Sequence, residues 1–437
     1  MLTEVRKKSF WLLDTFKGRK VKAHFDNISM VIENFQNPES RLYRENKLNS
    51  ILNHAISSTP FYQQFKNYNS LQDFPVINKN KVRDNFESFK STSFIDKKNT
   101  AVFTSGSTGT PFKLLLNSDK INRRTADAIY FAKIAGYEIG SKLYYMKVWN
   151  DINKKSSLKL WQENIVPYSV YRYTDKDFEA LIQELKDDKA DKSLIGFAST
   201  FELLCNYLDK IKSPSLNECN VKSIIANSDA LSTYTKNTME KYFGIPTISR
   251  YSNIENGILA QQSLEGGENF DINWASFYIE ILDLNNDIPA KYGELGRVVI
   301  TDLHNYSMPL IRYDNGDIAV MDKNPKGENH APVFTQISGR KADTIYNTCG
   351  HPITSYVVTP NMWKYRELKQ FQFEQYGHKD YKFKLNPIKN FTKEKEIIEE
   401  FKGYLGEDAN ISLEYVNEIP LLSSGKRSLI INTYHTK

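Results

Sequence analysis

The chain has 437 residues, more than a single hydrophobic core usually spans, so two or more domains are expected. A hydrophobic content of 40% with 13% aromatic residues supplies packed cores and excludes a disordered chain. The formal net charge of +6 is diluted among interspersed acids. This balance suits anionic small molecules and is too weak to indicate nucleic-acid binding.

Cysteine usage and hydropathy favour the cytoplasm. Cys205, Cys219 and Cys349 lie far apart without a C-x-x-C spacing, which disfavours a disulfide framework or a cysteine-rich zinc site. No apolar run approaches the roughly 18 residues that span a bilayer. Charges interrupt the first residues, so no signal peptide is expected there.

Residues 1–22 combine seven Lys or Arg with a cluster of large apolar side chains. The apolar residues of this segment are Phe10, Trp11, Leu12, Leu13 and Phe16. The pattern predicts an amphipathic helix with two possible uses. Docking on its own protein is favoured, and a weak peripheral contact with a membrane surface is the alternative.

Further along, periodicity predicts helices that alternate with strands. Helical spacing marks residues 41–66, ending near Pro60, and residues 126–134 before Gly136. Strands are expected at residues 193–197, 221–226, 277–282 and 296–301, with helices around 201–208 and 234–243. The charged run 187–192 is expected to be a solvated linker. Alternating strands and helices indicate an α/β architecture.

The last hundred residues have a different pattern. Lys-rich loops surround a helix that carries Ile397, Ile398, Phe401 and Leu405, followed by strands at 411–416 and 428–432. This is typical of a small α+β domain. We therefore predict an N-terminal domain over residues 1–338 and a C-terminal domain over residues 339–437.

The segment Phe103–Lys113, F-T-S-G-S-T-G-T-P-F-K, is the most informative stretch of the chain. Hydroxyl residues alternate with Gly106 and Gly109, and glycine allows backbone N–H groups to approach phosphate oxygens closely. A Walker P-loop is excluded because Thr110, not lysine, follows Gly109. Taken alone, the segment fits an ordinary hydroxyl-rich loop equally well.

Four later segments carry further polar residues in a fixed order. They are Arg250–Gly257 (R-Y-S-N-I-E-N-G), Pro309–Asp317 (P-L-I-R-Y-D-N-G-D), Ile337–Asp343 (I-S-G-R-K-A-D) and Ile419–Lys426 (I-P-L-L-S-S-G-K). Singly, each has a structural explanation as a core tyrosine, a turn acid or a surface lysine. Their order together with the glycine loop is the stronger observation.

The ordered set resembles the adenylate-forming (AMP-producing) ligase superfamily, most of all its branch with phenylacetate–coenzyme A ligase and CapK-like capsular polysaccharide biosynthesis proteins. Segments Leu48–Ala55, Thr59–Tyr62 and Leu71–Lys79 extend the resemblance toward the N-terminus. It implies a large N-terminal α/β domain that binds ATP and the acid. It also implies a smaller, mobile C-terminal α+β domain.

The resemblance also implies roles for single residues. Tyr251 would stack on adenine, Asp317 would bind both ribose hydroxyls, and Glu255 would hold Mg²⁺. Arg340 would face the ribose or a phosphate, and Lys426 would bridge the substrate carboxylate and the α-phosphate. The implied catalytic residues are Lys426, Glu255 and Arg340; the nucleotide-binding residues are Thr104, Ser105, Gly106, Ser107, Thr108, Gly109, Tyr251, Ser252, Asp317 and Arg340; the substrate-pocket residues are Phe197, Ala198, Ser199, Asn227, Ser228 and Asp229.

The chain departs from the family pattern at the hinge. Ala342 stands where an acid usually follows the arginine, and Asp343 is the candidate replacement. Ser252 stands where glycine is frequent.

The function expected is ATP-dependent activation of a carboxylic acid to an acyl-adenylate, with pyrophosphate release and then acyl transfer. The acceptor is a thiol, of coenzyme A or a carrier protein, or a sugar amine or hydroxyl, with surface polysaccharide biosynthesis as one setting. Both carbon–sulfur and carbon–nitrogen bond formation stay open, as do aryl, fatty and amino acids. The alternatives are a catalytically degenerate nucleotide-binding or scaffold protein of the same fold, and a nucleotidyltransferase that leaves AMP on its product.

Overall fold

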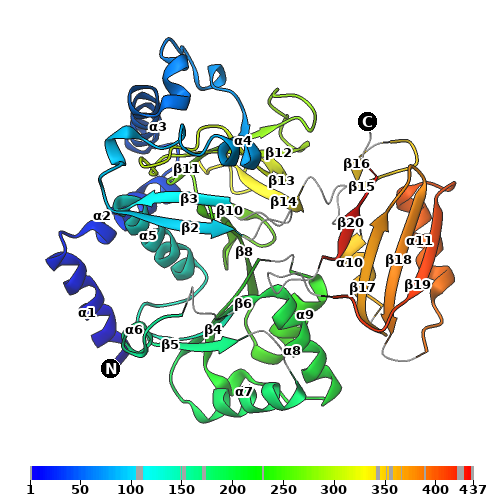
Figure 1. The fold of residues 1–437 in the computed structure, drawn as a ribbon. Helices are drawn as coiled ribbons and strands as arrows, with labels where there is room; N and C mark the ends of the chain where they lie inside the picture. Colours follow the sequence, from blue (N-terminus) through cyan, green and yellow to red (C-terminus); the bar gives the residue numbers. More distant parts are fainter. Residues whose placement is uncertain are drawn as a thin grey trace.

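The computed structural model describes residues 2–104, 112–147, 149, 154–169, 174–228, 231–340, 345–350, 352–353, 358–365, 367–387, 390–420 and 428–434. A large N-terminal unit carries most of the secondary structure, and a small C-terminal unit lies to one side of it (Figure 1). This is the mixed α/β architecture that the sequence predicts. None of the described helices is long and apolar enough to cross a membrane.

The amphipathic N-terminal segment folds into α1 (Leu2–Phe16) and the start of α2 (Lys20–Glu33). The Asp14 carboxylate accepts hydrogen bonds from the backbone N–H groups of Val21 (3.0 Å) and Lys22 (2.8 Å). The end of α1 therefore caps the start of α2. The Trp11 ring meets that of Phe25 edge-on, with 5.8 Å between centroids.

The third helix, α3 (Pro38–Ser58), corresponds to the helix predicted for residues 41–66. The Asn37 side chain caps its start by accepting from the Glu39 N–H at 2.9 Å. The helix ends before Pro60, where the tighter turn η1 (Pro60–Phe65) follows, because proline lacks the N–H that continues a helix. Three further 3₁₀ turns are η2 (Leu71–Asp73), η3 (Thr92–Phe94) and η4 (Asn217–Cys219).

A 12-stranded sheet in the described chain organises the large unit, in the order β11-β12-β13-β14-β10-β9-β8-β7-β6-β4-β5 with β1 beside β13. The strands are β1 (Ile77–Asn78), β4 (Lys142–Lys147), β5 (Ile165–Ser169), β6 (Lys192–Phe197), β7 (Val221–Asn227), β8 (Thr247–Asn253), β9 (Gly257–Gln262), β10 (Phe270–Ile272), β11 (Phe277–Leu282), β12 (Leu295–Asp302), β13 (Tyr313–Asp322) and β14 (Val333–Arg340). From β5 to β8 the pairing is parallel, and from β8 to β11 it is antiparallel.

Helices connect the parallel strands, as expected for crossover units. They are α6 (Ser157–Glu163), α7 (Asp175–Asp187), α8 (Ala198–Lys210) and α9 (Thr233–Phe243), whereas α4 (Lys79–Asp84) and α5 (Ser118–Ile134) precede β4 in the chain. A separate two-stranded hairpin, β2 (Asn99–Thr104) with β3 (Phe112–Asn117), precedes α5. The predicted strands at 193–197, 221–226, 277–282 and 296–301 correspond to β6, β7, β11 and β12.

Both faces of the central parallel strands β6 and β7 are largely buried. Leu194 and Ile224 pack with α7, α8 and α9 on one face, whereas Ile195, Ile225 and Ile248 pack with Ala135, directly after α5, on the other. Successive side chains of a strand point to opposite faces, so each strand feeds both layers. This explains the continuous apolar runs that predicted these strands.

One expectation about the large unit is wrong at a single residue. Residues 187–192 were expected to be a solvated linker, and Asp187 and residues 189–191 are exposed, but Lys192 is fully buried at the start of β6. Its Nζ donates to the backbone carbonyl oxygens of Asp188 (2.6 Å) and Cys219 (2.5 Å). The long aliphatic part of the lysine side chain lets its ammonium group reach these carbonyl oxygens. The pattern of charged residues in the sequence does not reveal such a contact.

The small unit is built on a four-stranded sheet of the order β19-β18-β17-β20. Its elements are β15 (Ile345–Tyr346), β16 (Pro352–Ile353), α10 (Val358–Trp363), β17 (Leu368–Gln375), β18 (Asp380–Pro387), α11 (Glu394–Leu405), β19 (Asn410–Tyr415) and β20 (Ile430–Asn432). As predicted, Ile397, Phe401 and Leu405 of α11 are buried. The domain boundary predicted between residues 338 and 339 falls inside β14, and the described chain resumes at Ile345.

Candidate functional site

Two of the residues assigned to the nucleotide lie in direct contact. The hydroxyl of Tyr251, in β8, donates to Asp317 Oδ2, in β13, at 2.6 Å. Asn315 Nδ2 donates to the Tyr251 hydroxyl oxygen at 2.7 Å and to Asp317 Oδ2 at 2.9 Å. Tyr251 is 64 positions from Asn315 and 66 positions from Asp317 in the sequence, yet the three side chains form one hydrogen-bonded group, which we call the polar joint.

The electrostatics of this joint keep Tyr251 a hydrogen-bond donor. Burial raises the pKa of Tyr251 well above its usual value, and the neighbouring Asp317 carboxylate raises it further. The Tyr251 ring also meets Phe334 of β14 edge-on, with 6.3 Å between centroids. A tyrosine held at both its ring and its hydroxyl presents a fixed aromatic surface.

Glu255 lies in the turn between β8 and β9 and is 8% exposed. Its Oε1 is 4.0 Å from Lys79 Nζ, at the start of α4. Burial raises the pKa of Tyr313, and the neighbouring Glu255 carboxylate raises it further. One buried carboxylate fits Mg²⁺ well, because this ion takes one or two protein carboxylates and fills its other positions with phosphate and water oxygens.

Lys79 is a residue to which the sequence gave no role, although it closes the matched segment Leu71–Lys79. Besides approaching Glu255, its Nζ lies 5.4 Å from the ring centroid of Phe112. Phe112 pairs with Thr104 across the β2–β3 hairpin, so these two residues bracket the glycine loop. The cation therefore lies between the metal-site candidate and the base of that loop.

Several assigned residues cannot be placed. Ser105, Gly106, Ser107, Thr108, Gly109, Asp229 and Lys426 lie outside the described residues, as do the hinge residues Ala342 and Asp343. The backbone of Thr104 ends β2, and the backbone of Arg340 pairs with Asp317 at the end of β14. The backbone of Arg340 therefore lies on β14, directly beside the residue Asp317 of the joint.

The assigned pocket residues gather at the carboxyl ends of the parallel strands. Phe197 ends β6 and pairs with Asn227, which ends β7. Asn227 in turn pairs with Arg250, the residue before Tyr251. Ala198 and Ser199 begin α8, Ser228 has a positive φ of 71° directly after β7, and Ser252 lies in β8. In open α/β sheets this edge is where ligands bind.

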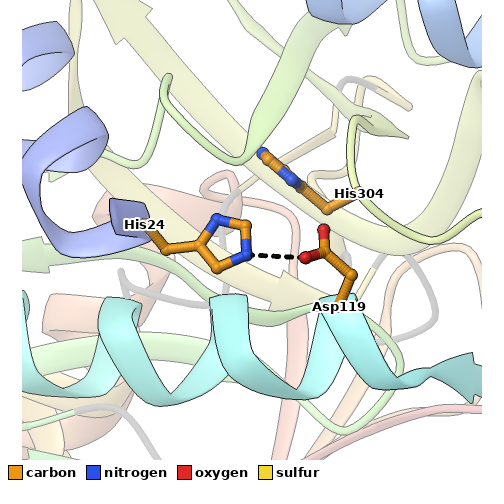
Figure 2. Close-up of side chains that lie close together, drawn as sticks. All are labelled: His24, Asp119 and His304. Atoms are coloured by element: carbon orange, nitrogen blue, oxygen red, sulfur yellow. Dashed lines mark hydrogen bonds and ion pairs between the residues drawn. The ribbon is translucent and has the colours of Figure 1, made fainter. Parts of the chain in front are cut away.

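A separate cluster joins three elements of the large unit. His24 Nε2, from α2, is 3.0 Å from Asp119 Oδ1, in the first turn of α5, and His304 follows β12 (Figure 2). One ligand atom from each residue lies within 4.8 Å of the others, close enough for a shared metal ion.

Charge argues against a metal ion in this cluster. Burial, and then the charges of Arg123, Lys47, Lys120 and His24, lower the pKa of His304 well below its usual value. A dication would have to enter beside these cations. We therefore interpret the cluster as a structural joint between α2, α5 and the chain after β12.

The comparisons with known proteins agree with this geometry. Residues 345–433 match the family described as the CapK C-terminal domain. The chain is 23% identical over 411 residues to protein CapK of Staphylococcus aureus, covering 87% of this chain and 86% of CapK. It is 20% identical to phenylacetate-coenzyme A ligase of Escherichia coli (strain K12), covering 72% of this chain and 74% of that enzyme.

Among solved structures, 2-hydroxyisobutyryl-CoA ligase in the postadenylation state, in complex with R3-HIB-AMP, superposes with a TM-score of 0.71. The identity is 16%, and 91% of each chain is covered. ATP-bound MatB of Rhodopseudomonas palustris superposes with a TM-score of 0.57 at 12% identity, covering 75% of this chain and 66% of MatB.

The chain has the fold of the adenylate-forming ligases. Its last part is the CapK C-terminal domain, which confirms the resemblance inferred from the ordered motifs. In this fold the joint of Tyr251, Asn315 and Asp317 lies within the large domain. The matched C-terminal domain spans the small unit that begins at β15.

Proposed function

We propose that the chain activates a carboxylic acid with ATP, forming an acyl-adenylate and pyrophosphate, and then transfers the acyl group to a thiol. The observation that carries this proposal is the Tyr251–Asn315–Asp317 joint, with its half-buried carboxylate and fixed aromatic ring, on the fold of the adenylate-forming ligases. In this assignment Asp317 accepts hydrogen bonds from the ribose hydroxyls and Tyr251 offers its ring to the adenine.

The chemistry explains the cations around this joint. A carboxylate that attacks the α-phosphate of ATP brings negative charges together, so cations and hydrogen-bond donors must stabilise the charge that develops. Glu255 would hold a Mg²⁺ ion, which supplies positive charge at the phosphates. Lys79, Arg340, the glycine-loop residues 104–109 and Lys426 would contribute the remaining donors and charges.

Coenzyme A is the acceptor that the relatives favour. The names of phenylacetate-coenzyme A ligase and 2-hydroxyisobutyryl-CoA ligase state a coenzyme A thioester, and one structure of the second ligase contains both 2-HIB-AMP and CoA. A carrier-protein thiol or a sugar amine or hydroxyl is the alternative acceptor. Similarity to CapK supports it, with surface polysaccharide biosynthesis as the setting and carbon–nitrogen bond formation as one outcome.

An acid-dependent pyrophosphate assay tests the proposal. Purified protein, ATP and Mg²⁺ are incubated with a panel of monocarboxylic, dicarboxylic, aromatic and amino acids, and pyrophosphate release is followed. At least one acid should release pyrophosphate, and coenzyme A should then yield AMP and the thioester. ATP binding without release for any acid would favour the scaffold alternative. A product that retains AMP in mass spectrometry would favour nucleotidyl transfer.

A cytoplasmic location and weak contact with a membrane surface form the final part of the proposal. Helix α1 leaves five large apolar side chains exposed. They are Leu2 (70% exposed), Val5 (54%), Leu12 (57%), Leu13 (55%) and Phe16 (81%). At 100° per residue these positions fall on one stripe of the helix, beside the basic residues of the segment. Such a surface fits the interface of an anionic bilayer.

A further inference from the structure

A row of side chains crosses the carboxyl ends of the parallel strands. Phe197 pairs with Asn227, Asn227 with Arg250, and Arg250 with Gln261 of β9, so the four residues lie on neighbouring strands. Lys147 extends the row, because it directly follows Met146, which pairs with Gly196 on β6.

The members of the row on β4 to β8 share one face of the sheet. Ile195, Ile225 and Ile248 pack together on the face that meets α5, with Tyr145 against them. Side chains two positions further along a strand return to the same face. Lys147, Phe197, Asn227 and Arg250 therefore all lie on this face, whereas Tyr251, the next residue of β8, lies on the other.

Arg250 is fixed on one side and unpaired on the other. Its Nε donates to Gln261 Oε1 at 2.6 Å, and the fully buried Gln261 donates in turn to the backbone oxygen of Phe131 at 2.5 Å. Its second terminal nitrogen, Nη2, is shielded from solvent and has no hydrogen-bond partner among the residues that the structure describes. Among the described residues no carboxylate lies within 4.0 Å of this guanidinium.

A shielded cation without a counter-ion is costly. Burial lowers the pKa of Arg250 to about 10, which leaves the guanidinium charged at neutral pH. A buried charge without a partner destabilises a fold, because it loses its hydration and gains no compensating interaction. A guanidinium is also the group best suited to bind a planar carboxylate with two parallel hydrogen bonds.

Two neighbours reinforce the polarity of the row. The side-chain oxygen of Asn227 is shielded from solvent and has no hydrogen-bond partner within the described part of the chain. Lys147 places its Nζ 4.0 Å from the ring centroid of Trp149 and 5.0 Å from that of Tyr145. Across the described part of the chain, Lys147 has no carboxylate at ion-pair distance either. The row therefore offers a ligand the cations Lys147 and Arg250 and the amide of Asn227, beside the aromatic rings of Phe197, Tyr145 and Trp149.

We infer that Arg250 is a specificity residue which binds a second carboxylate of the acid, so that the substrate class is the dicarboxylic acids rather than simple aryl or fatty acids. This inference rests on the proposed acid activation. In this arrangement the acid lies over the carboxyl-end edge of the sheet. One carboxylate reacts with ATP on the side of Tyr251, and the other reaches the side of α5 and pairs with Arg250 Nη2. A hydroxyl on the same acid would donate to the Asn227 side-chain oxygen.

Acids of nearly equal size, with and without a second carboxylate, isolate the contribution of that carboxylate to kcat/KM. Succinate and glutarate are compared with their monomethyl esters and with butyrate and pentanoate, in acid-dependent pyrophosphate release. The wild-type kcat/KM for the dicarboxylates should exceed that for the monoesters by about 10- to 100-fold, the usual range for hydrogen bonds to a charged group. Equal values for diacid and monoester would overturn the inference.

The variant Arg250→Gln tests the residue itself. It should remove the preference by lowering kcat/KM for the dicarboxylates while leaving the monoesters unchanged. A uniform loss for all acids would contradict the inference, because Arg250 would then bind the reacting carboxylate. Lys222→Gln is the matched control: Lys222 is an exposed cation on β7, at the opposite end of the strand, and its replacement should change nothing.

Thermal unfolding supplies a readout that does not depend on turnover. Because Nη2 has no partner, Arg250→Gln should keep or raise the Tm of the free protein, whereas a structural guanidinium would make the variant melt lower. Glutarate without ATP should raise the Tm of the wild type and not that of the variant. If glutarate raises the wild-type Tm but no acid releases pyrophosphate, the binding inference stands and the proposed activation fails.

Discussion

At the scale of single residues, the polar joint of β8 and β13 gives the sharpest test of the nucleotide site. Asp317→Ala removes the acceptor assigned to the ribose hydroxyls, and hydrogen bonds to a charged group contribute about 1.5–3 kcal/mol each. The Kd for ATP should therefore rise about 10- to 100-fold. Tyr251→Phe should raise it less, because the ring stays and only the hydroxyl that donates to Asp317 is lost.

Titration calorimetry with ATP measures both effects. The control is Asp322→Asn, on the same strand β13, where the carboxylate accepts from the backbone N–H of Lys323. An unchanged ATP affinity in Asp317→Ala would refute the assignment of this joint to the nucleotide.

The buried His304 makes a prediction about pH. The folded protein keeps this imidazole neutral, because burial and nearby cations lower its pKa well below 6.5, whereas the unfolded chain binds a proton near that value. The stabilising contribution is thus fully present above about pH 6.5 and is lost as the pH falls, by up to about 1.4 kcal/mol per pH unit. The hydrogen bond from His24 lowers the pKa of Asp119 below 3.8, so that carboxylate titrates outside this window.

Melting curves between pH 5 and 7.5 test this sign. The Tm of the wild type should fall toward pH 5, and His304→Gln should show a shallower fall. If both proteins show the same slope, His304 is not the group responsible. A metal chelator should leave the Tm unchanged, since we assign the cluster of Figure 2 to packing. A rise in Tm with zinc would contradict that assignment.

Sequence patterns identified the residues that lie inside recognisable motifs and missed those that complete the site. Tyr251 and Asp317 stand in such motifs, and the structure brings them to 2.6 Å of each other. Asn315 stands two positions before Asp317, yet nothing in the motif shows that its amide bridges two strands. Lys79 and Arg250 were likewise missed, because a role in charge compensation depends on neighbours from distant segments.

At the scale of elements, periodicity predicted the types of helices and strands well. The central parallel strands β6 and β7 are largely buried on both faces, so each appears in the sequence as a short continuous apolar run. Boundaries were less accurate where side-chain chemistry decided them. Ser58 ends α3 because of Pro60, and the buried Lys192 belongs to β6 because carbonyl groups receive its charge.

Helix α1 gives the prediction that belongs to this scale. Its inner side is tied to the protein by Asp14, which caps α2, and by the ion pair of Lys7 with Glu138. The exposed stripe can therefore meet a bilayer without unfolding the helix. The double variant Leu12→Ser/Phe16→Ser should lose binding to anionic vesicles by more than about tenfold, because burying each large apolar side chain contributes about 1.5–3 kcal/mol.

Vesicle flotation with anionic and neutral lipids measures this binding, and pyrophosphate release should be unaffected in the double variant. Leu42→Ser is the control, since Leu42 is 58% exposed on α3. Equal flotation of wild type and double variant would assign the stripe no role at membranes.

At the scale of the whole molecule, two units of different architecture agree with the composition and length of the chain. The arrangement of the units carries further information. The TM-score against 2-hydroxyisobutyryl-CoA ligase is 0.71 for the postadenylation state and 0.58 for the thioesterification state, at nearly equal coverage. Because both structures are of the same ligase, the difference between the two TM-scores indicates that the small unit is placed more as in the postadenylation state. No sequence pattern specifies such a placement, because it depends on a hinge.

We propose that adenylation and transfer use the small domain differently in this chain, and that Lys426 acts only in adenylation. It lies outside the described residues, so its role is inferred from the segment Ile419–Lys426. Lys426→Ala should lower the rate of pyrophosphate release by about 10²- to 10³-fold, the loss typical of one group that stabilises transition-state charge. The Kd for ATP should stay within about threefold, because the lysine acts on charge that develops only in the reaction.

The transfer half-reaction provides the decisive contrast. Wild type and Lys426→Ala are given the chemically prepared acyl-adenylate together with coenzyme A, and thioester formation is measured. The variant should match the wild type here, because a rotated small domain no longer presents this lysine to the reacting atoms. Lys395→Ala, an exposed lysine on α11, should be normal in both half-reactions. If Lys426→Ala releases pyrophosphate at the wild-type rate, the lysine has no role in adenylation. If the variant loses rate equally in both half-reactions, one domain arrangement serves them both.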